Sequence, residues 1–453
     1  MTLDVERILA QQSSGLPRYT SYPPANHFVP GGGAALTDAL AQAAREADAV
    51  SLYIHIPFCD RMCWFCGCHT KQVQRHDPVV TYIGDLVEEI ALWGRKLGQR
   101  PKVSKLHLGG GSPSLLQAQD LAAIRQALHA AFDFSSEPEV SIEIDPSDVK
   151  SASIDNLMAV GMTRASIGVQ DFDPVVQAAI NRPQSFELTR DIVEALRAAG
   201  IGSINIDALY GLPLQTQDRF VRTVEQVIAL QPDRIALFGY AHVPWMKTHQ
   251  RMIKDEDLPN GLQRFHDAEV GSAMIARAGY QVIGIDHFAK PDDSLAIAAR
   301  NGKLHRNFQG YTDDDAAVRL GFGASAIGCF DGGFVQNEVA TGRYQDMVRK
   351  GSIPLARGLA LNEEDRLYGR VIELLMCDFG FAYGQLEREF GPAVAAPAIS
   401  LARKVAALDK DGLCRSSTTG FEMTPDARPF VRIVAARFDQ WLQRTEGKYS
   451  KVV

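Results

Sequence analysis

The chain has 453 residues, of which 46% are hydrophobic and 22% are charged, and it carries a net charge of −7. This composition is ordinary for a soluble globular protein, and the length favours two domains. The negative charge argues against a general binder of nucleic acids or anionic membranes, because both partners attract basic surfaces. The start, MTLDVERILAQQ, lacks the apolar segment of an export signal, and no apolar run is long enough to span a membrane, so we expect a cytoplasmic protein.

Short apolar runs alternate with helix-like segments from residue 50 to about residue 290. This alternation predicts a parallel sheet with crossover helices, and six units suggest a barrel or partial barrel. In such folds the functional residues lie at the carboxyl ends of the strands. The predicted strands are Leu52–Ile56, Lys105–Leu108, Val140–Asp145, Ala165–Val169, Ser203–Ala208 and Arg234–Phe238. The predicted helices are Val79–Leu97, Gln117–Ala131, Ile154–Val160, Glu187–Ala199 and Gln217–Leu230.

Four of the seven cysteines follow the first predicted strand within ten residues: Cys59, Cys63, Cys66 and Cys68. An odd number of cysteines in a cytoplasmic protein fits a disulfide framework poorly, so the group is better interpreted as metal-binding or catalytic. The first three have the spacing C-x3-C-x2-C, which can hold a [4Fe–4S] cluster and leave its fourth iron open to a substrate or cofactor. A zinc site made from these three and either Cys68 or His69 is the alternative.

Polar residues also follow the second and later strands. The turn Gly109–Ser112 comes directly after the second strand, and its glycines permit close approach to a ligand and offer backbone N–H groups. In the third strand, a period of two places Ser141, Glu143 and Asp145 on one face. Asp207 alternates with apolar residues in the same way in the fifth strand. This pattern predicts a polar site inside the barrel, although a single buried carboxylate is often structural.

The pattern changes to helices near residue 360. Asn362 is typical of a helix N-cap, and an acidic first turn follows it. Lys410–Leu413 and Ser416–Gly420 indicate a turn and a hairpin, and Thr424-Pro425 indicates the start of another helix. Residues 362–453 contain 13 Lys or Arg and 13 Asp or Glu. A DNA-reading winged helix is therefore not expected, and we predict a lid or packing domain.

The cysteine spacing resembles that of the radical SAM enzymes, which use S-adenosylmethionine (SAM). The fourth thiol, Cys68, narrows the resemblance to the oxygen-independent coproporphyrinogen III oxidases. The resemblance covers nearly the whole chain, and the departures from the family pattern are Trp64, His69, Ser112 and Ser147. The blocks that carry it are Pro17–Pro23, His55–Cys59, Gly168–Phe172, Asn181-Arg182, Asn205–Asp207, Tyr240–His242, Asp286–Ala289 and His305–Tyr311.

This resemblance implies an α/β fold: a radical SAM partial (β/α)6 barrel with an extra N-terminal segment and a mostly helical C-terminal domain. The implied domains are an N-terminal arm over the active site (1–45), the catalytic barrel with an extension (46–355) and a mostly helical domain with a small hairpin (362–453). The implied function is that of an oxidoreductase of porphyrin and haem biosynthesis. Two propionates of coproporphyrinogen III are oxidatively decarboxylated to vinyl groups without oxygen, which gives protoporphyrinogen IX. The reaction begins with a 5′-deoxyadenosyl radical, made from SAM at a [4Fe–4S] cluster, which takes a hydrogen atom from the propionate β-carbon. The propionate then loses CO2 and one electron.

The resemblance also implies a role for individual residues, and it implies two bound SAM molecules. Cys59, Cys63 and Cys66 match the cluster ligands. Tyr53, Cys68 and Glu143 match catalytic positions. Four residues match family contacts to the first SAM: Tyr53, Gly110, Glu143 and Ile327. Seven residues match family contacts to the second SAM: Phe65, Gly111, Ser112, Gln170, Arg182, Asp207 and Ala241. Arg182 would clamp a carboxylate and Asp207 would receive an ammonium group, whereas the alternative is a structural ion pair between these two residues.

The implied partners are coproporphyrinogen III and a small electron-donor protein or other reductant, with no nucleic acid and no membrane insertion, and the family expectation is a monomer. Because the substrate carries four propionates, we expect a local cationic rim from among Arg18, Lys247, Lys290, Arg300 and Arg306. The alternative function is that of a radical-SAM-like haem chaperone. Relatives of that kind generally lack the equivalent of Cys68 and the block Asn307–Tyr311, both of which are present here.

Overall fold

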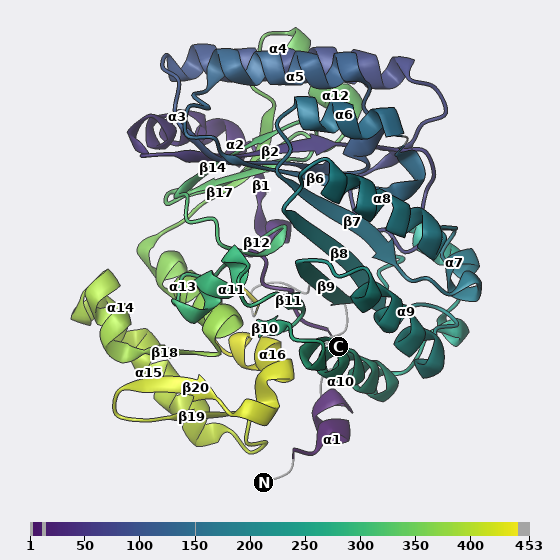
Figure 1. Cartoon of the computed structure of the whole chain (residues 1–453). Coiled ribbons are helices and arrows are strands. Elements are labelled where there is room, and N and C mark those ends of the chain that lie inside the picture. Colours follow the sequence, from purple (N-terminus) through teal and green to yellow (C-terminus); the bar gives the residue numbers. More distant parts are fainter. Residues whose placement is uncertain (1–2, 11–14, 150, 443–453) are drawn as a thin grey trace.

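The computed structural model describes residues 3–10, 15–149 and 151–442, and one large sheet runs through its centre (Figure 1). Six neighbouring strands of this sheet are parallel: β2 (Val50–Ile56), β5 (Val103–Gly110), β6 (Glu139–Ile144), β7 (Arg164–Gln170), β8 (Ser203–Tyr210) and β9 (Arg234–Gly239). Each coincides with a run predicted from the sequence to within a few residues. The predicted partial (β/α)6 barrel is therefore confirmed.

Helices connect these strands and cover the outer face of the sheet (Figure 1). Those predicted from apolar spacing are α4 (Asp77–Leu97), α5 (Ala118–Ala131), α6 (Ser151–Ala159), α8 (Phe186–Ala198) and α9 (Gln217–Ala229). Polar side chains fix where two of them begin. Ser185 accepts a hydrogen bond from the Leu188 N–H at the start of α8, and Thr216 accepts one from the Arg219 N–H at the start of α9.

The sheet continues beyond the barrel on both sides. Strand β14 (Val318–Phe322) pairs in parallel with β2, and it is followed outward by the antiparallel strands β15 (Ile327–Phe330), β16 (Gly333–Asn337), β17 (Leu355–Ala360) and β1 (Val29–Pro30). Next to β9 lie β11 (His287–Ala289) and β10 (Gln281–Ile283), also antiparallel. The sequence predicts no strand in these segments, because they are short and do not alternate with helices.

Several short elements complete this part of the chain. The helices are α1 (Val5–Ala10), α2 (Gly32–Ala35), α3 (Thr37–Glu46), α7 (Pro174–Ala179), α10 (Gly261–Arg277), α11 (Ser294–Arg300) and α12 (Thr341–Arg349). The 3-10 turns are η1 (Ala25–His27), η2 (Pro113–Leu115), η3 (Pro146–Asp148), η4 (Thr248–Met252) and η5 (Asp255–Asp257). Two small pairs, β3 (Phe58–Cys59) with β4 (Lys71–Gln72) and β12 (His305–Asn307) with β13 (Gly310–Thr312), lie outside the main sheet.

The chain after residue 360 is mostly helical, as predicted. Asn362 forms a capping box with Asp365 at the start of α13. The predicted hairpin is formed by β19 and β20, and the helix expected after Thr424 begins as a 3-10 turn. The elements are α13 (Glu363–Asp378), β18 (Gly380–Ala382), α14 (Tyr383–Phe390), α15 (Pro392–Leu408), β19 (Cys414–Ser416), β20 (Gly420–Met423), η6 (Pro425–Phe430) and α16 (Val431–Ala435).

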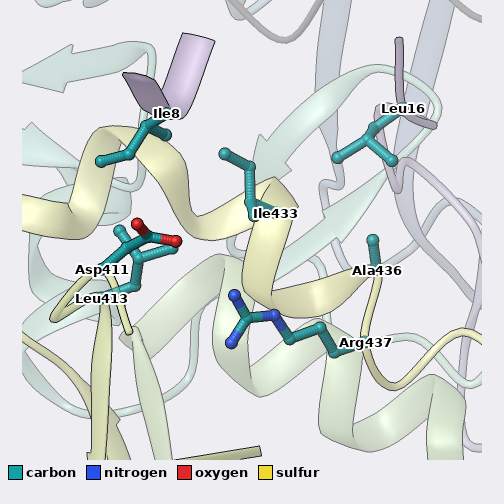
Figure 2. Close-up of a pocket in the computed structure, with 7 residues that line it drawn as sticks. All are labelled: Ile8, Leu16, Asp411, Leu413, Ile433, Ala436 and Arg437. Atoms are coloured by element: carbon teal, nitrogen blue, oxygen red, sulfur yellow. The ribbon is translucent and has the colours of Figure 1, made fainter. Parts of the chain in front are cut away.

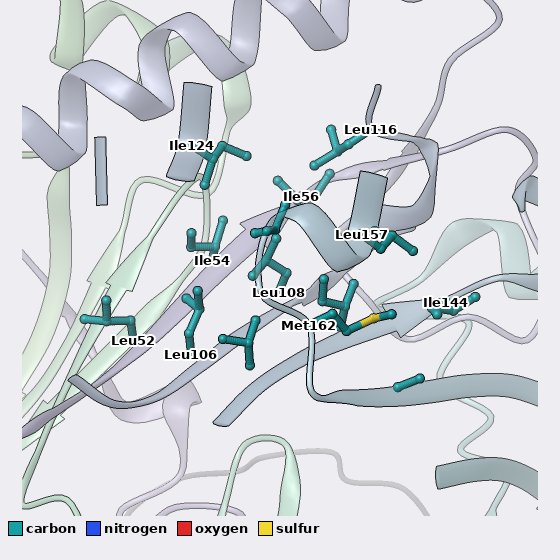
Figure 3. Packing of buried hydrophobic residues seen from close by; sticks show 14 of the residues in the cluster. Leu52, Ile54, Ile56, Leu106, Leu108, Leu116, Ile124, Ile144, Leu157 and Met162 are labelled. Carbon is teal, nitrogen blue, oxygen red and sulfur yellow. The ribbon is translucent and has the colours of Figure 1, made fainter. Parts of the chain in front are cut away.

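Alternation along the barrel strands separates the core from the site. Leu52, Ile54 and Ile56 of β2 are buried in the main apolar cluster together with Leu106 and Leu108 of β5 (Figure 3). Successive side chains of a strand point to opposite faces. The intervening residues of β2 and β5 therefore face the barrel interior.

The N-terminal segment packs against the C-terminal part of the chain. Ile8 and Leu16 belong to the second apolar cluster, which is built mainly from residues 367–438. Figure 2 shows both side chains beside Ile433, at a small cavity of about 200 Å³. The division of the chain at residues 45, 355 and 362 stays a prediction. No helix in the described residues is long and apolar enough to cross a membrane.

Candidate active site

A loop with four free cysteines follows β2 at its carboxyl end. Cys63 is buried, Cys59 and Cys66 are half-buried, and Cys68 is exposed. The Cys59 Sγ lies 3.1 Å from the Thr70 hydroxyl, and the Cys68 N–H donates to the Cys66 Sγ at 3.3 Å. Exposure thus sets Cys68 apart from the three predicted cluster ligands.

Side chains from two distant segments hold the backbone of this cysteine loop. In each contact a side-chain nitrogen donates to a backbone carbonyl of the loop. The pairs are Asn181 with Met62 (2.9 Å), Lys247 with Cys68 (2.9 Å), His249 with Cys66 (2.7 Å) and Gln250 with Phe65 (2.9 Å). The sequence marked Asn181 and Lys247 for other reasons. It gave no signal for His249 or Gln250, because a side chain that supports a distant loop has no local pattern.

The donor set of the loop fits an iron–sulfur cluster. Burial, together with the nearby thiols of Cys66 and Cys63, raises the pKa of Cys59 to about 12, so the three groups lie close enough to interact. Among the residues that the structure describes, however, the three sulfurs are not all within 4.8 Å of one another. The sulfur ligands of one tetrahedral zinc ion are about 3.8 Å apart. In a cubane each cysteine binds a different iron, so the three sulfurs need not approach so closely, and the loop is compatible with a [4Fe–4S] cluster.

Glu143 is the polar centre of the neighbouring strands. Its Oε2 accepts the Gly110 N–H at 2.9 Å, and its Oε1 lies 3.2 Å from His107 Nε2. Burial alone would raise the pKa of Glu143, but the bonds from His107 and Gly110 hold it below its ordinary value. Tyr53 lies beside them, with its ring stacked on that of His107 at 5.8 Å between centroids and its hydroxyl 2.9 Å from His55 Nδ1. The structure thus brings together Tyr53, Gly110 and Glu143, three of the four residues predicted to contact the first SAM.

The glycine turn after β5 has a different role from the one expected. Gly110 donates to Glu143, Gly111 donates to the Ile56 carbonyl at 2.8 Å, and Ser112 donates to the Phe58 carbonyl at 2.7 Å. The expectation that the turn offers exposed N–H groups to a ligand is therefore wrong for these three residues, because the N–H of Gly110 bonds to Glu143 and those of Gly111 and Ser112 bond to β2 and β3. The glycines are needed for space: a Cβ on Gly110, whose φ is +105°, would lie 2.3 Å from the His55 ring.

Ile327 reaches the same region from far along the chain. It begins β15, which is antiparallel to β14, and β14 pairs with β2 so that Gly321 stands opposite Tyr53. A Cβ on Gly321 would lie 2.8 Å from the Ile327 carbonyl. The strand order therefore places Ile327 near Tyr53.

A second polar group lies around Gly168 on β7. Arg182 donates to the Gly168 carbonyl at 2.6 Å, to Asp145 Oδ2 at 2.9 Å and to the Cys63 Sγ at 3.5 Å. The side-chain amide of Gln170 and the guanidinium of Arg182 both lie within 3.2 Å of the point where a Gly168 side chain would begin. Arg182 therefore connects the cysteine loop to the predicted second SAM position.

Asp207 stands opposite Gly168 across the β7–β8 pair. Its Oδ1 accepts a hydrogen bond from Asn205 at 2.8 Å, and burial raises its pKa to about 6. Among the ion pairs of the described residues, Arg182 is paired with Asp145 and not with Asp207. The alternative of a structural Arg182–Asp207 pair is therefore not what the structure contains.

The remaining predicted contacts flank this group. Gln250 donates to the Ala241 carbonyl at 3.2 Å as well as to that of Phe65, so one buried amide ties the two segments together. Ser112 is buried, and its hydroxyl bonds to Asp148 and lies 2.9 Å from the Ser114 hydroxyl.

The basic residues expected to form a rim are separated by the structure. Lys247 lies at the cysteine loop, Lys290 pairs with Asp233 at 3.1 Å, and Arg300 donates to Gln281 at 2.7 Å. Arg18 and Arg306, in contrast, line one cavity.

The chain is similar to known proteins over nearly its whole length. Residues 53–227 match the model of the Radical SAM superfamily. A protein of Cereibacter sphaeroides named oxygen-independent coproporphyrinogen III oxidase is 42% identical over 97% of this chain and 98% of its own. One of the same name from Bradyrhizobium diazoefficiens is 43% identical over 97% of both chains. A solved structure described as coproporphyrinogen III oxidase (HemN) from Escherichia coli, a radical SAM enzyme, has a TM-score of 0.89 at 36% identity and covers 97% of this chain and 99% of its own.

Proposed function

Because the chain belongs to the oxygen-independent coproporphyrinogen III oxidase family of radical SAM enzymes, we propose that it oxidatively decarboxylates two propionates of coproporphyrinogen III without oxygen. Each propionate becomes a vinyl group, and the product is protoporphyrinogen IX. The observation that carries this proposal is the joint presence of the three-thiol loop and the two polar groups centred on Glu143 and Arg182, at one edge of the barrel.

Cys59, Cys63 and Cys66 would hold the [4Fe–4S] cluster. When bound, the cluster and SAM supply a one-electron cleavage whose radical removes a hydrogen atom from the propionate β-carbon. The protein keeps its loop in place through the carbonyl contacts of His249, Lys247 and Asn181, and it shields the reaction from water and stray hydrogen donors.

We assign the first SAM to the group around Glu143. The carboxylate is ionised at neutral pH, because its pKa is held below the ordinary value, and it is fixed by Gly110 and His107. It suits the ammonium group or the ribose hydroxyls of SAM. Tyr53 and Ile327 supply the apolar wall beside it.

We assign a second SAM to the group around Arg182. Two of its guanidinium nitrogens contact Asp145 and Gly168, while Arg182 Nε is buried and has no hydrogen-bond partner among the described residues. In this assignment that N–H would donate to the carboxylate of SAM, and Asp207 Oδ2 would receive the ammonium group of the same zwitterion.

Cys68 serves the reaction and not the cluster in this proposal. It is exposed, and two hydrogen bonds fix its backbone: its carbonyl accepts from Lys247 Nζ, and its N–H donates to the Cys66 Sγ. A thiol two residues beyond the last ligand can then meet the substrate.

The decisive test is an anaerobic assay with purified, cluster-reconstituted protein, a reductant, SAM and coproporphyrinogen III. Mass spectrometry should detect a monovinyl intermediate and then protoporphyrinogen IX, with none formed by a Cys59→Ala control or without SAM. Stoichiometric haem binding with no conversion of the porphyrinogen would instead favour a haem chaperone.

A further inference from the structure

Four arginines line a cavity of about 310 Å³ between the barrel, the N-terminal segment and the C-terminal helices. Arg18 comes from the N-terminal segment, Arg264 from α10, Arg306 from β12 and Arg432 from α16. The acids of the lining are Asp286 and Glu269. We call this space the arginine cavity, and its lining has an excess of positive charge.

Backbone carbonyls hold these side chains in position. Arg18 donates to the Gly239 carbonyl at 2.8 Å, Arg264 to the Tyr240 carbonyl at 2.8 Å, and Arg432 Nε to the Pro17 carbonyl at 3.0 Å. A carbonyl is a neutral acceptor, so these three bonds orient the guanidinium groups and add no negative charge to the cavity. Burial, followed by repulsion from Arg18 and Arg306, lowers the pKa of Arg432 to about 9.

Arg306 shows most directly that an acceptor belongs in this space. Its side chain is 5% exposed and stacks on the Tyr311 ring at 4.4 Å. Its Nη1 is 3.9 Å from Asp286 Oδ1, an atom that also lies 2.7 Å from His287 Nδ1. Within the described residues, Nε and Nη1 of Arg306 have no hydrogen-bond partner. Buried donors without acceptors are costly, so an anion would stabilise this arrangement.

The arginine cavity adjoins the proposed second SAM position. Its wall includes Tyr210, which ends β8 just after Asp207, and Gly239, which ends β9 just before Ala241. His287, the partner of Asp286, is close enough to Asp207 to act on its pKa. The cavity is therefore at the same carboxyl edge of the strands as the reactive centre.

We propose that the arginine cavity binds propionate carboxylates of coproporphyrinogen III that are not reacting, and so sets which edge of the macrocycle faces the reactive centre. This rests on the proposed function. A guanidinium binds a carboxylate through two parallel hydrogen bonds, which suits a propionate. The volume is at the lower end of ligand pockets, so it suits side chains and not a whole macrocycle. In a chain of net charge −7, a tetra-anionic substrate also needs a local cationic site.

A purely structural role accounts for only part of the cavity. Arg18 and Arg432 attach the N-terminal segment to the barrel and to α16. Arg306 also contacts the N-terminal segment, because its Nη2 donates to the Arg18 carbonyl at 3.5 Å. That contact still leaves Nε and Nη1 of Arg306 without a hydrogen-bond partner among the described residues. An anionic ligand satisfies them.

The test compares Arg306→Gln with wild type and with Arg415→Gln, a control at an exposed arginine on the C-terminal hairpin. Fluorescence titration of anaerobic, cluster-reconstituted protein with coproporphyrin III, the stable oxidised form of the substrate, gives Kd. We expect Kd and the KM for coproporphyrinogen III to rise about 10- to 100-fold in Arg306→Gln, with substrate-free SAM cleavage unchanged. Arg415→Gln should match wild type. Arg18→Gln, at a more exposed position, should show a smaller loss of the same kind and serves if Arg306→Gln does not fold.

The tetramethyl ester of coproporphyrin III distinguishes carboxylate recognition from a change of shape. The ester should bind wild type weakly, and Arg306→Gln should weaken it no further. Unchanged Kd in a folded variant, or equal losses for acid and ester, would overturn the proposal. A further outcome concerns inorganic phosphate. If phosphate stabilises wild type but not Arg306→Gln, while Arg306→Gln still binds coproporphyrin III normally, the cavity is a site for small anions and the proposal is overturned. If wild type binds coproporphyrin III without oxidising the porphyrinogen, the proposed function fails, and the titration still decides the role of the cavity.

Discussion

The cysteine loop and the arginine cavity each gather four side chains of one kind, but they are assembled in opposite ways. The four cysteines lie within ten residues of sequence, and the four arginines extend from position 18 to position 432. The loop needs only its own short segment and a few supporting contacts to present its thiols. The cavity needs the N-terminal segment, two barrel strands, α10, β12 and α16 to be in place together. Changes of the three predicted ligands in the loop should therefore abolish the cofactor, whereas changes of residues that are far apart in the sequence should leave the cofactor in place and weaken one ligand.

The largest effect is expected from Cys59→Ala, Cys63→Ala or Cys66→Ala. Two thiolates do not replace three at a cubane, so each variant should lose the cluster, its brown colour and all SAM cleavage. Iron and sulfide analysis after anaerobic reconstitution checks this. A variant with full iron content and normal turnover would show that the loop does not supply the ligands.

Cys68→Ser tests whether the loop acts as one unit. We expect a complete [4Fe–4S] cluster and intact SAM binding, with most porphyrinogen oxidation lost, because the exposed thiol serves the substrate. Iron content and product formation are measured on the same sample. If both fall in parallel, Cys68 is a fourth ligand and the distinction within the loop is wrong.

Asp207→Asn tests the proposed second SAM position, whose residues come from several distant segments of the chain. It removes the charge and keeps the shape, so the second SAM should be lost while the cluster and the first SAM remain. Binding of labelled SAM should fall from about two per chain towards about one, since a buried charge left unpaired costs about 3–5 kcal/mol. Asp155→Asn, on the outer helix α6, is the control. A folded Asp207→Asn protein that still binds two SAM molecules would contradict the assignment.

A smaller, graded effect is expected from pH. Burial raises the pKa of Asp207 to about 6, so this carboxylate is ionised above that pH and becomes neutral below it. Affinity for the second SAM should fall about tenfold for each pH unit below about 6, and the first SAM should be retained because the pKa of Glu143 is held low. Titrations of labelled SAM between pH 5 and pH 7 measure both sites. An Asp207→Asn variant should lack this dependence.

Local patterns predicted most of the barrel. The six parallel strands and five of their helices follow from the alternation of apolar runs, because each element carries its own periodicity. The strands β14 to β17 were not predicted, because β14 (Val318–Phe322) is far along the chain from β2 (Val50–Ile56), with which it pairs, and its own sequence is short and mixed. The cysteine ligands were also predicted from their spacing on one loop, and their assignment stays a prediction.

The parts of the site that the sequence did not predict depend on long-range contacts. That Asp145 is the partner of Arg182 could not be read from residues 37 positions apart. The bonds of the glycine turn to Ile56 and Phe58 depend on the pairing of β5 with the neighbouring loop. Arg18 and Arg306 were named as two of several basic candidates, and only the fold showed that they share a cavity with Arg264 and Arg432.

The bonds from Arg432 to the carbonyls of Leu16 and Pro17 join residues more than 400 positions apart. During translation the N-terminal segment emerges first, and domains fold as they are completed. The six parallel barrel strands and the cysteine loop are all synthesised by residue 239, whereas Arg432 lies in α16, the last helix of the described residues. A ribosome-bound chain can thus build the place for its metal cofactor well before it can close the arginine cavity, and the N-terminal segment must wait for the end of synthesis to reach its final position.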